Sequence, residues 1–92
     1  MNKKFEISEE YFYVAAAALE TKEEAQEFFK ALCTKKETQL IAQRLYVAKL
    51  LSENKVYIDI VKETGASSAT VSRVKRAMET DRDYFTKLLG KL

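Results

Sequence analysis

The 92-residue sequence contains no proline, and its only glycines are Gly65 and Gly90. Proline and glycine are the residues that most strongly disfavour a helix interior, so few positions in this chain oppose helix formation. Apolar residues recur at a spacing near 3.6 residues throughout, and alanine, leucine, lysine and glutamate dominate the composition. The sequence therefore predicts an all-α fold with short connections and no internal repeat or interdomain linker.

Residues that favour helix ends divide the chain into about six short helices. TKEE at 21–24 and TKKE at 34–37 are capping boxes, in which a threonine and a glutamate three residues later bond to each other's backbone N–H groups. Gly65 favours the left-handed conformation that ends a helix, and TDRD at 80–83 indicates the start of a last one. We expect helices at about 9–19, 21–32, 34–52, 57–64, 68–78 and 81–90.

The residue types needed for most catalytic chemistry are scarce. The chain has no histidine and a single cysteine, Cys33, so neither a zinc ligand set nor a histidine-dependent nucleophile can be assembled. The acidic pairs at 9–10 and 23–24 stand beside predicted helix starts, where carboxylates favour the helix dipole. We expect no enzyme, no metal site and no cofactor.

Length and charge indicate one domain, 1–92, in the cytoplasm. No run of eighteen apolar residues is present, and the charged start MNKKFEISEE does not resemble a leader peptide, so no membrane partner is expected. A lone cysteine fits a reducing compartment. The net charge is only +2, but residues 64–78 contain three Lys or Arg and no acid. The local basic patch, rather than the total charge, bears on binding to phosphates.

The first predicted helix is apolar on every side. Its sequence YFYVAAAAL, at 11–19, leaves no polar face, which is typical of a helix that is buried all round. A 92-residue chain can enclose few such helices, so this pattern favours a subunit interface in the N-terminal half. The alternative is a helix that lies across its own bundle.

Residues 56–78 predict a helix-turn-helix. Val71, Val74 and Met78, with Ala77 beyond them, form one apolar stripe on the second helix. Ile60, Val61 and Thr64 on the first helix can face that stripe, and the small Ala66 suits a tight turn.

The opposite face of the second helix is small, polar and basic, as DNA reading requires. We expect its N-terminal residues Ser68, Ala69 and Ser72 to approach base edges, and Lys75 and Arg76 to meet phosphates. Thr70 either reaches a phosphate or stabilises the helix start, and Arg73 completes the outward face. The alternatives are a solvated basic face and, for Lys75, a side chain that extends along the edge of the core.

Arg44 lies inside the apolar arc of the third helix. Leu40, Ile41, Leu45 and Ala48 surround it on the helical wheel, which predicts a buried arginine that must be paired. Its partner would be a carboxylate, such as Glu37 or one from another subunit, or else an anionic ligand.

Two segments, LCTKKETQLIAQRLYVAKLL and ETGASSATVSRVKRAM, closely resemble the Trp repressor-like proteins and, within them, the small YerC/YecD-type group. The resemblance covers about residues 28–78. It implies an all-α, intertwined homodimer whose helix-turn-helix units enter successive major grooves of double-stranded DNA.

The resemblance also implies a possible ligand pocket at Thr34, Arg44 and Arg73, since two arginines enclose the indole of bound tryptophan in the tryptophan repressor. Val74, however, replaces a glycine against which that ligand lies, and Ala77 replaces a serine that helps hold its amino group. We therefore expect no tryptophan corepression, and no other effector is identified.

Together these features predict a homodimeric, sequence-specific DNA-binding transcriptional regulator that acts as a repressor. Dimerisation is assigned to about 8–53, the helix-turn-helix to about 56–78 and a C-terminal helix to about 81–90. The alternative is a protein-interaction module that keeps the Trp repressor-like scaffold and has lost DNA binding.

Overall fold

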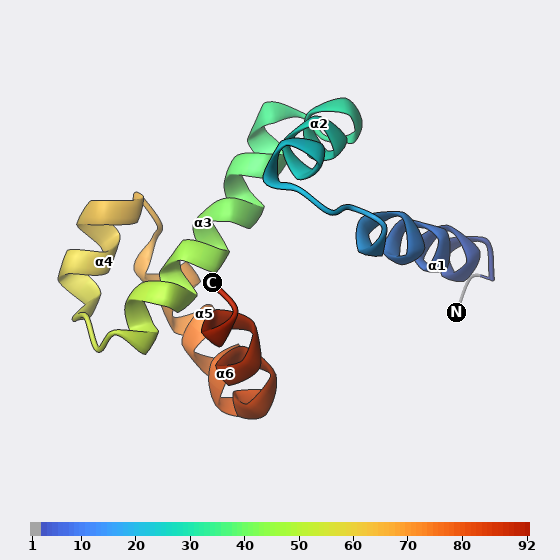
Figure 1. The fold of residues 1–92 in the computed structure, drawn as a ribbon. Coiled ribbons are helices and arrows are strands. Elements are labelled where there is room, and N and C mark those ends of the chain that lie inside the picture. The colour runs from blue at the N-terminus through green and yellow to red at the C-terminus, as the bar shows by residue number, and fades with distance from the viewer. Residues whose placement is uncertain (1–2) are drawn as a thin grey trace. The chain divides into compact units, whose positions relative to one another are not determined.

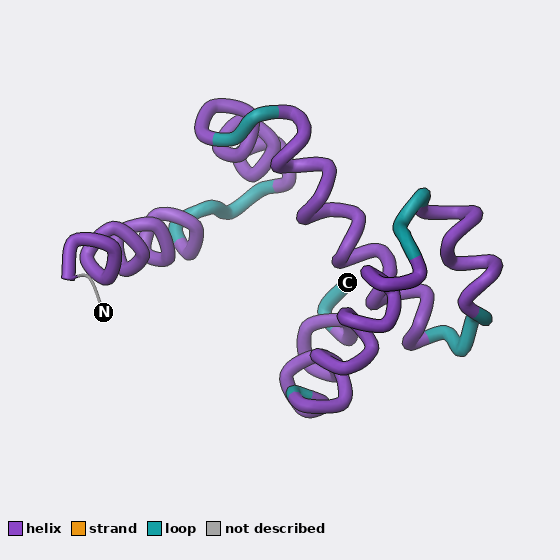
Figure 2. The backbone as a smooth tube through the Cα atoms, turned by 180° about the vertical axis from the view of Figure 1, so that it is seen from behind, coloured by secondary structure: helices purple, strands orange, loops and turns teal. Residues whose placement is uncertain are grey.

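The computed structural model describes residues 3–92, which contain six helices and no strand (Figure 1). The all-α prediction is confirmed, and short loops connect the helices (Figure 2). The chain divides into two compact units, Met1–Thr38 and Gln39–Leu92. The helices are α1 (Lys3–Ala17), α2 (Lys22–Leu32), α3 (Lys35–Ser52), α4 (Tyr57–Thr64), α5 (Ser68–Thr80) and α6 (Arg82–Gly90).

The predicted capping box at 34–37 is present in full. At 21–24 Thr21 caps α2, but the Glu24 carboxylate accepts the Glu20 N–H over 3.3 Å instead of that of Thr21. The backbone N–H of Glu24 donates to Thr21 Oγ1 over 3.0 Å, and that of Glu37 donates to Thr34 Oγ1 over 3.1 Å. The second box is fully reciprocal, because the Thr34 N–H donates to Glu37 Oε1 over 2.7 Å. These bonds set the starts of α2 and α3.

The predicted start of α1 is wrong. The helix begins at Lys3 rather than near Glu9, and it ends at Ala17 rather than near Leu19. Ser8, a residue type that favours N-caps and stands directly before the predicted start, lies within the helix and donates its hydroxyl to Lys4 O over 3.0 Å. A serine can satisfy its hydroxyl in this way inside a helix, so the residue type alone does not mark a helix start.

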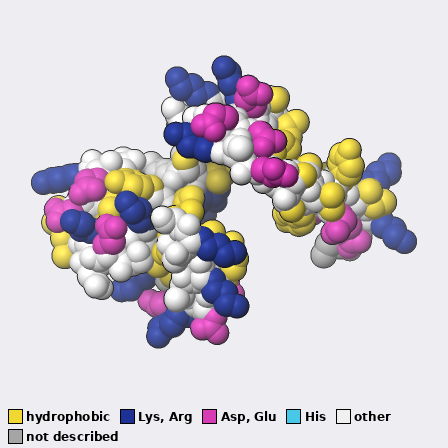
Figure 3. Space-filling model, in the orientation of Figure 1, with side chains coloured by type: hydrophobic (Ala, Val, Ile, Leu, Met, Phe, Trp, Pro, Cys, Tyr) yellow, Lys and Arg dark blue, Asp and Glu magenta, His cyan; other side chains and the backbone are white. Residues whose placement is uncertain are grey.

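Helix α1 contacts α2 through one aromatic pair, Phe12 and Phe28, whose ring centroids lie 5.8 Å apart. None of its described residues is buried. Tyr11 is 77% exposed and Ile7 is 66% exposed, on a face distinct from that of Phe12. The space-filling view shows hydrophobic side chains at the surface of this helix (Figure 3). The all-round burial that the sequence of α1 predicts is therefore not present over residues 3–92.

The core of the C-terminal unit lies between the last turns of α3 and the helices α4 and α5. Ile60, Val47 and Val71 are its largest fully buried side chains. Phe85 of α6 packs against this cluster, as does Tyr57 of α4. The complete buried set is Val47, Ala48, Leu50, Ile60, Ala66, Val71 and Val74.

The junction between α5 and α6 differs in detail from the prediction. Helix α5 continues to Thr80, whose hydroxyl donates to Arg76 O over 3.0 Å instead of capping α6. Asp81 occupies the N-cap position of α6 without a side-chain bond to the helix. Over residues 3–92, no helix is both long and apolar enough to cross a membrane.

Candidate nucleic-acid interface

Three residues, Gly65, Ala66 and Ser67, connect α4 to α5. Gly65 ends α4 in the left-handed conformation, with φ of 73°, and its N–H donates to Val61 O over 2.9 Å. The Thr64 hydroxyl donates to Ile60 O over 2.7 Å and accepts the Ala66 N–H over 3.1 Å. Ala66 is only 2% exposed, so the predicted requirement for a small residue in the turn is confirmed. The N–H groups of Gly65 and Ala66 are therefore hydrogen-bonded within the turn, and the side chain that the turn buries is the methyl group of Ala66.

Replacing Gly65 by alanine is expected to lower the free energy of unfolding by about 1–2 kcal/mol, because a residue with a Cβ is strained at positive φ. The loss would come from the backbone, since an added Cβ would lie 3.8 Å from Gln43 Nε2, an ordinary contact. Gly90→Ala is the matched control, because Gly90 is helical and nothing lies within 4 Å of its added Cβ. Urea denaturation of both variants checks this, and equal effects would contradict the assignment of strain to Gly65.

The inner face of α5 agrees with the prediction in two positions of the stripe. Val71 is 0% exposed and Val74 is 7% exposed, while Met78 is half-buried. Ala77, expected at the edge of the stripe, is exposed. The stripe is therefore narrower than the sequence indicates: Met78, together with Phe85 of α6, packs against the core cluster, and Ala77 lies outside it.

The outer face of α5 brings the proposed DNA-contacting residues together. Its first turn contains no acid, and the first acidic residue of the helix is Glu79. A helix N-terminus carries partial positive charge, to which Arg73 and Arg76 on this face and Lys75 at its edge add. Among the predicted DNA-contacting residues, the half-buried side chains are those of Thr70 and Ser72. The exposed side chains are those of Ser68, Ala69, Arg73, Lys75 and Arg76.

Ser67 is a structural residue that the sequence reading did not single out. Its Oγ accepts the Thr70 N–H over 3.1 Å and lies 3.1 Å from Thr70 Oγ1. Ser67 is thus the N-cap of α5, and Thr70 stabilises the helix start, one of the two roles expected for it. The sequence does contain a serine directly before the first helical residue, but because Ser68 follows it, the sequence does not tell which of the two serines is the N-cap.

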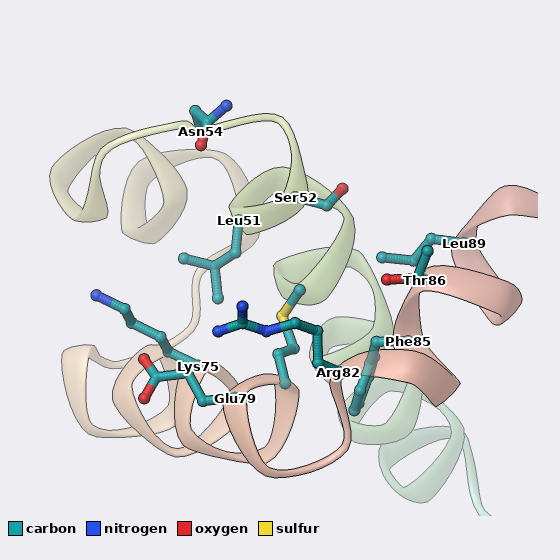
Figure 4. A pocket seen from close by; sticks show the side chains of 10 residues that line it. Leu51, Ser52, Asn54, Lys75, Glu79, Arg82, Phe85, Thr86 and Leu89 are labelled. Atoms are coloured by element: carbon teal, nitrogen blue, oxygen red, sulfur yellow. The ribbon is translucent and has the colours of Figure 1, made fainter.

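Lys75 points along the helix surface. Its Nζ lies 5.7 Å from the centroid of the Tyr57 ring, at cation–π distance. It also lines a hollow of about 580 Å³, together with the charged Glu79 and Arg82 and the apolar Leu51 and Phe85 (Figure 4). This placement agrees with the alternative reading of Lys75, a side chain lying at the edge of the core.

The two arginines of the expected ligand pocket lie on one hollow of about 210 Å³. Arg44 and Arg73 line it together with Leu40, Gln43 and Thr70. The prediction that Arg44 is buried is wrong for the single chain, because Arg44 is exposed. Over residues 3–92 the structure shows no ion pair to it. The apolar residues around Arg44 are likewise open to solvent in the single chain, since Leu40 is 45% exposed and Leu45 is 42% exposed.

Thr34 and Glu37 are engaged with each other at the start of α3. The hydrogen bond from the Thr34 N–H lowers the pKa of Glu37 below its ordinary value of 4.5. The cap is thus complete above that ordinary value and is lost as the pH falls through the lowered one. Glu37 therefore caps α3, and over residues 3–92 the structure shows no ion pair between it and Arg44.

The α4–turn–α5 unit, with a buried inner face and a basic outer face, defines a helix-turn-helix protein of the DNA-binding class. The chain belongs to the Trp repressor protein family, whose family model matches residues 9–92. This is a family of DNA-binding regulators rather than enzymes.

The relatives of this chain support the same assignment. It is 45% identical over 75 residues to the uncharacterized protein YerC of Bacillus subtilis (strain 168), covering 82% of this chain and 72% of the relative. A crystal structure from Staphylococcus aureus, provisionally named a Trp repressor, matches with a TM-score of 0.86 and 40% identity, covering 92% of this chain and 85% of that one. A TrpR-like protein from Eubacterium eligens ATCC 27750 has the same TM-score of 0.86 at 36% identity, covering 98% of this chain and 94% of that one.

Proposed function

We propose that this protein is a sequence-specific DNA-binding transcriptional regulator that acts in the cytoplasm as a homodimeric repressor. One observation carries the proposal: α5 buries Val71 and Val74, while its opposite face exposes Arg73 and Arg76 and has no acid before Glu79. Ser68, Ala69 and Ser72 stand at the N-terminal end of this face, where base edges are approached first. Arg73, Lys75 and Arg76 supply the positive charge that phosphates require, and Thr70 holds the helix start.

The dimer is supported by the apolar surface of the N-terminal half. Tyr11, Ile7 and Val14 of α1 are 77%, 66% and 60% exposed in the single chain, and so large an apolar face on a small domain favours a protein partner. We assign dimerisation to residues of about 8–53, the helix-turn-helix to about 56–78 and a terminal helix to about 81–90. The helix-turn-helix units of the two subunits would bind DNA half-sites about one helical turn apart, and the bound dimer would exclude polymerase sterically.

The proposal is tested by the salt dependence of DNA binding. If each subunit neutralises about three phosphates, the logarithm of affinity falls with the logarithm of salt concentration at a slope near −5. Fluorescence anisotropy with fragments selected from random DNA measures that slope. Absence of binding at low salt would contradict the proposal and favour the alternative, a protein-interaction module that keeps this scaffold.

L-Tryptophan is expected to give no binding heat in isothermal titration calorimetry. Val74 is 7% exposed and packed in the core, and its branched side chain stands where the resemblance places an indole beside glycine. Ala77 provides no hydroxyl for an amino group. Titration of tryptophan into buffer is the control, and a dissociation constant in the micromolar range would contradict this part of the proposal.

A further inference from the structure

Gln43 makes a hydrogen bond unlike the others in the C-terminal unit. Its Nε2 donates to Thr64 O over 3.0 Å, in a half-buried position, and joins residues 21 positions apart. The other side-chain hydrogen bonds of residues 39–92 join residues at most four positions apart. This one bond therefore links α3 to the end of α4 across the fold.

The acceptor is a carbonyl that the helix itself leaves open. Thr64 is the last residue of α4, and the last carbonyls of a helix have no partner within it. The Gln43 amide also lies over the turn, because a Cβ added to Gly65 would be 3.8 Å from Nε2. Gln43 thus contacts the helix-turn-helix at the point where the chain changes direction between its two helices.

We propose that Gln43 is a positioning residue, which fixes the turn of the helix-turn-helix against α3 and so sets the angle at which α5 is presented. The consequence for DNA rests on the proposed function, in which α3 belongs to the dimerisation segment. In that arrangement, the bond to Thr64 O couples the reading helix to the dimer and makes the two α5 helices hold one spacing.

The variant Gln43→Met tests the hydrogen bond from Gln43 to Thr64 O, because it keeps the side-chain length and removes the donor. We expect the amides of Gly65 and Ala66 to exchange with deuterium about three- to tenfold faster, the effect of losing one net hydrogen bond. The amides of Val71 and Val74 should keep their rates. Gln43→Glu, which replaces the donor by an acceptor in the same shape, should give the same pattern and serves if the methionine variant does not fold.

Gln39→Met is the matched control, since Gln39 is exposed one turn earlier on α3. It should leave the exchange of all four amides unchanged. Equal acceleration at the turn and within α5 would indicate general destabilisation and overturn the proposal. Unchanged rates at Gly65 and Ala66 would overturn it as well.

A second measurement tests the consequence for DNA. It compares the affinity for a selected site with the affinity for a site in which the spacing between the same two half-sites is increased by one base pair. In Gln43→Met this affinity ratio should fall about three- to tenfold, the worth of one net hydrogen bond, whereas binding to random DNA at low salt and the salt slope should not change. An unchanged ratio would overturn the positioning role. If the unsubstituted protein binds no DNA, the proposed function fails, and the exchange measurement still decides whether Gln43 holds the turn.

Discussion

Replacing Ile60 by alanine is expected to lower the free energy of unfolding by about 3 kcal/mol. Ile60 is 0% exposed and lies in the core between Val47 and Val71. Removing its branched side chain loses the transfer free energy of the deleted groups and leaves a cavity, which together cost about 2–5 kcal/mol in such substitutions. Small domains are stable by only about 5–15 kcal/mol, so this one change should remove much of the stability. Urea denaturation at a fixed protein concentration measures the loss, because dimerisation would make stability depend on concentration.

Ile58→Ala is the matched control for Ile60→Ala. Both residues are isoleucines of α4, two positions apart, but Ile58 is 69% exposed. Its truncation should change the free energy of unfolding by less than about 1 kcal/mol, as is usual for surface positions. A loss at Ile58 as large as that at Ile60 would contradict the packing described for α4, or would show that a partner covers Ile58.

The helix-turn-helix could be predicted from the sequence because its determinants are local. The left-handed turn depends on Gly65 and the tight approach on Ala66, and both act within a few residues of their position. The capping box at Thr34 and Glu37 is equally local. The buried stripe at Val71 and Val74 follows from helical periodicity, so it too can be read without the fold.

The features that could not be predicted depend on what surrounds a helix. Helical periodicity places Arg44 in an apolar arc with Leu40 and Leu45 and so predicts its burial, yet all three residues are exposed in the single chain. The periodicity of a helix reports that a face will be covered but does not identify the covering element. The same holds for α1, whose Tyr11 is 77% exposed among the described residues. For the candidate site, the choice between Ser67 and Ser68 as the N-cap of α5, and the Gln43 bond, required the three-dimensional structure.

The proposed division of labour on α5 is tested by a pair of alanine substitutions with different expected signatures. Arg76→Ala should weaken binding to all DNA sequences by about 3 kcal/mol per dimer, taking about 1.5 kcal/mol, the lower end for a hydrogen bond to a charged group, for each of two contacts. The salt slope should become shallower by about 2, one phosphate contact per subunit. Anisotropy titrations on selected and random DNA at several salt concentrations measure both quantities. Lys87→Ala on α6 removes the same charge from another exposed position, and it should change neither quantity by a comparable amount.

Ser72→Ala should instead alter the order of preference among sequences while leaving the salt slope unchanged. Ser72 is half-buried on the outer face near the start of α5, and its hydroxyl is neutral, so its removal changes no phosphate neutralisation. A hydroxyl that contacts a base edge discriminates only at the base pair it touches, and the loss should therefore be confined to particular positions of a selected site. Selection of binding sites by both variants separates the two roles. If Arg76→Ala and Ser72→Ala reduced binding to every sequence equally, the assignment of Ser72 to base edges and of Arg76 to phosphates would be wrong. Helix α5 would then bind DNA through charge alone.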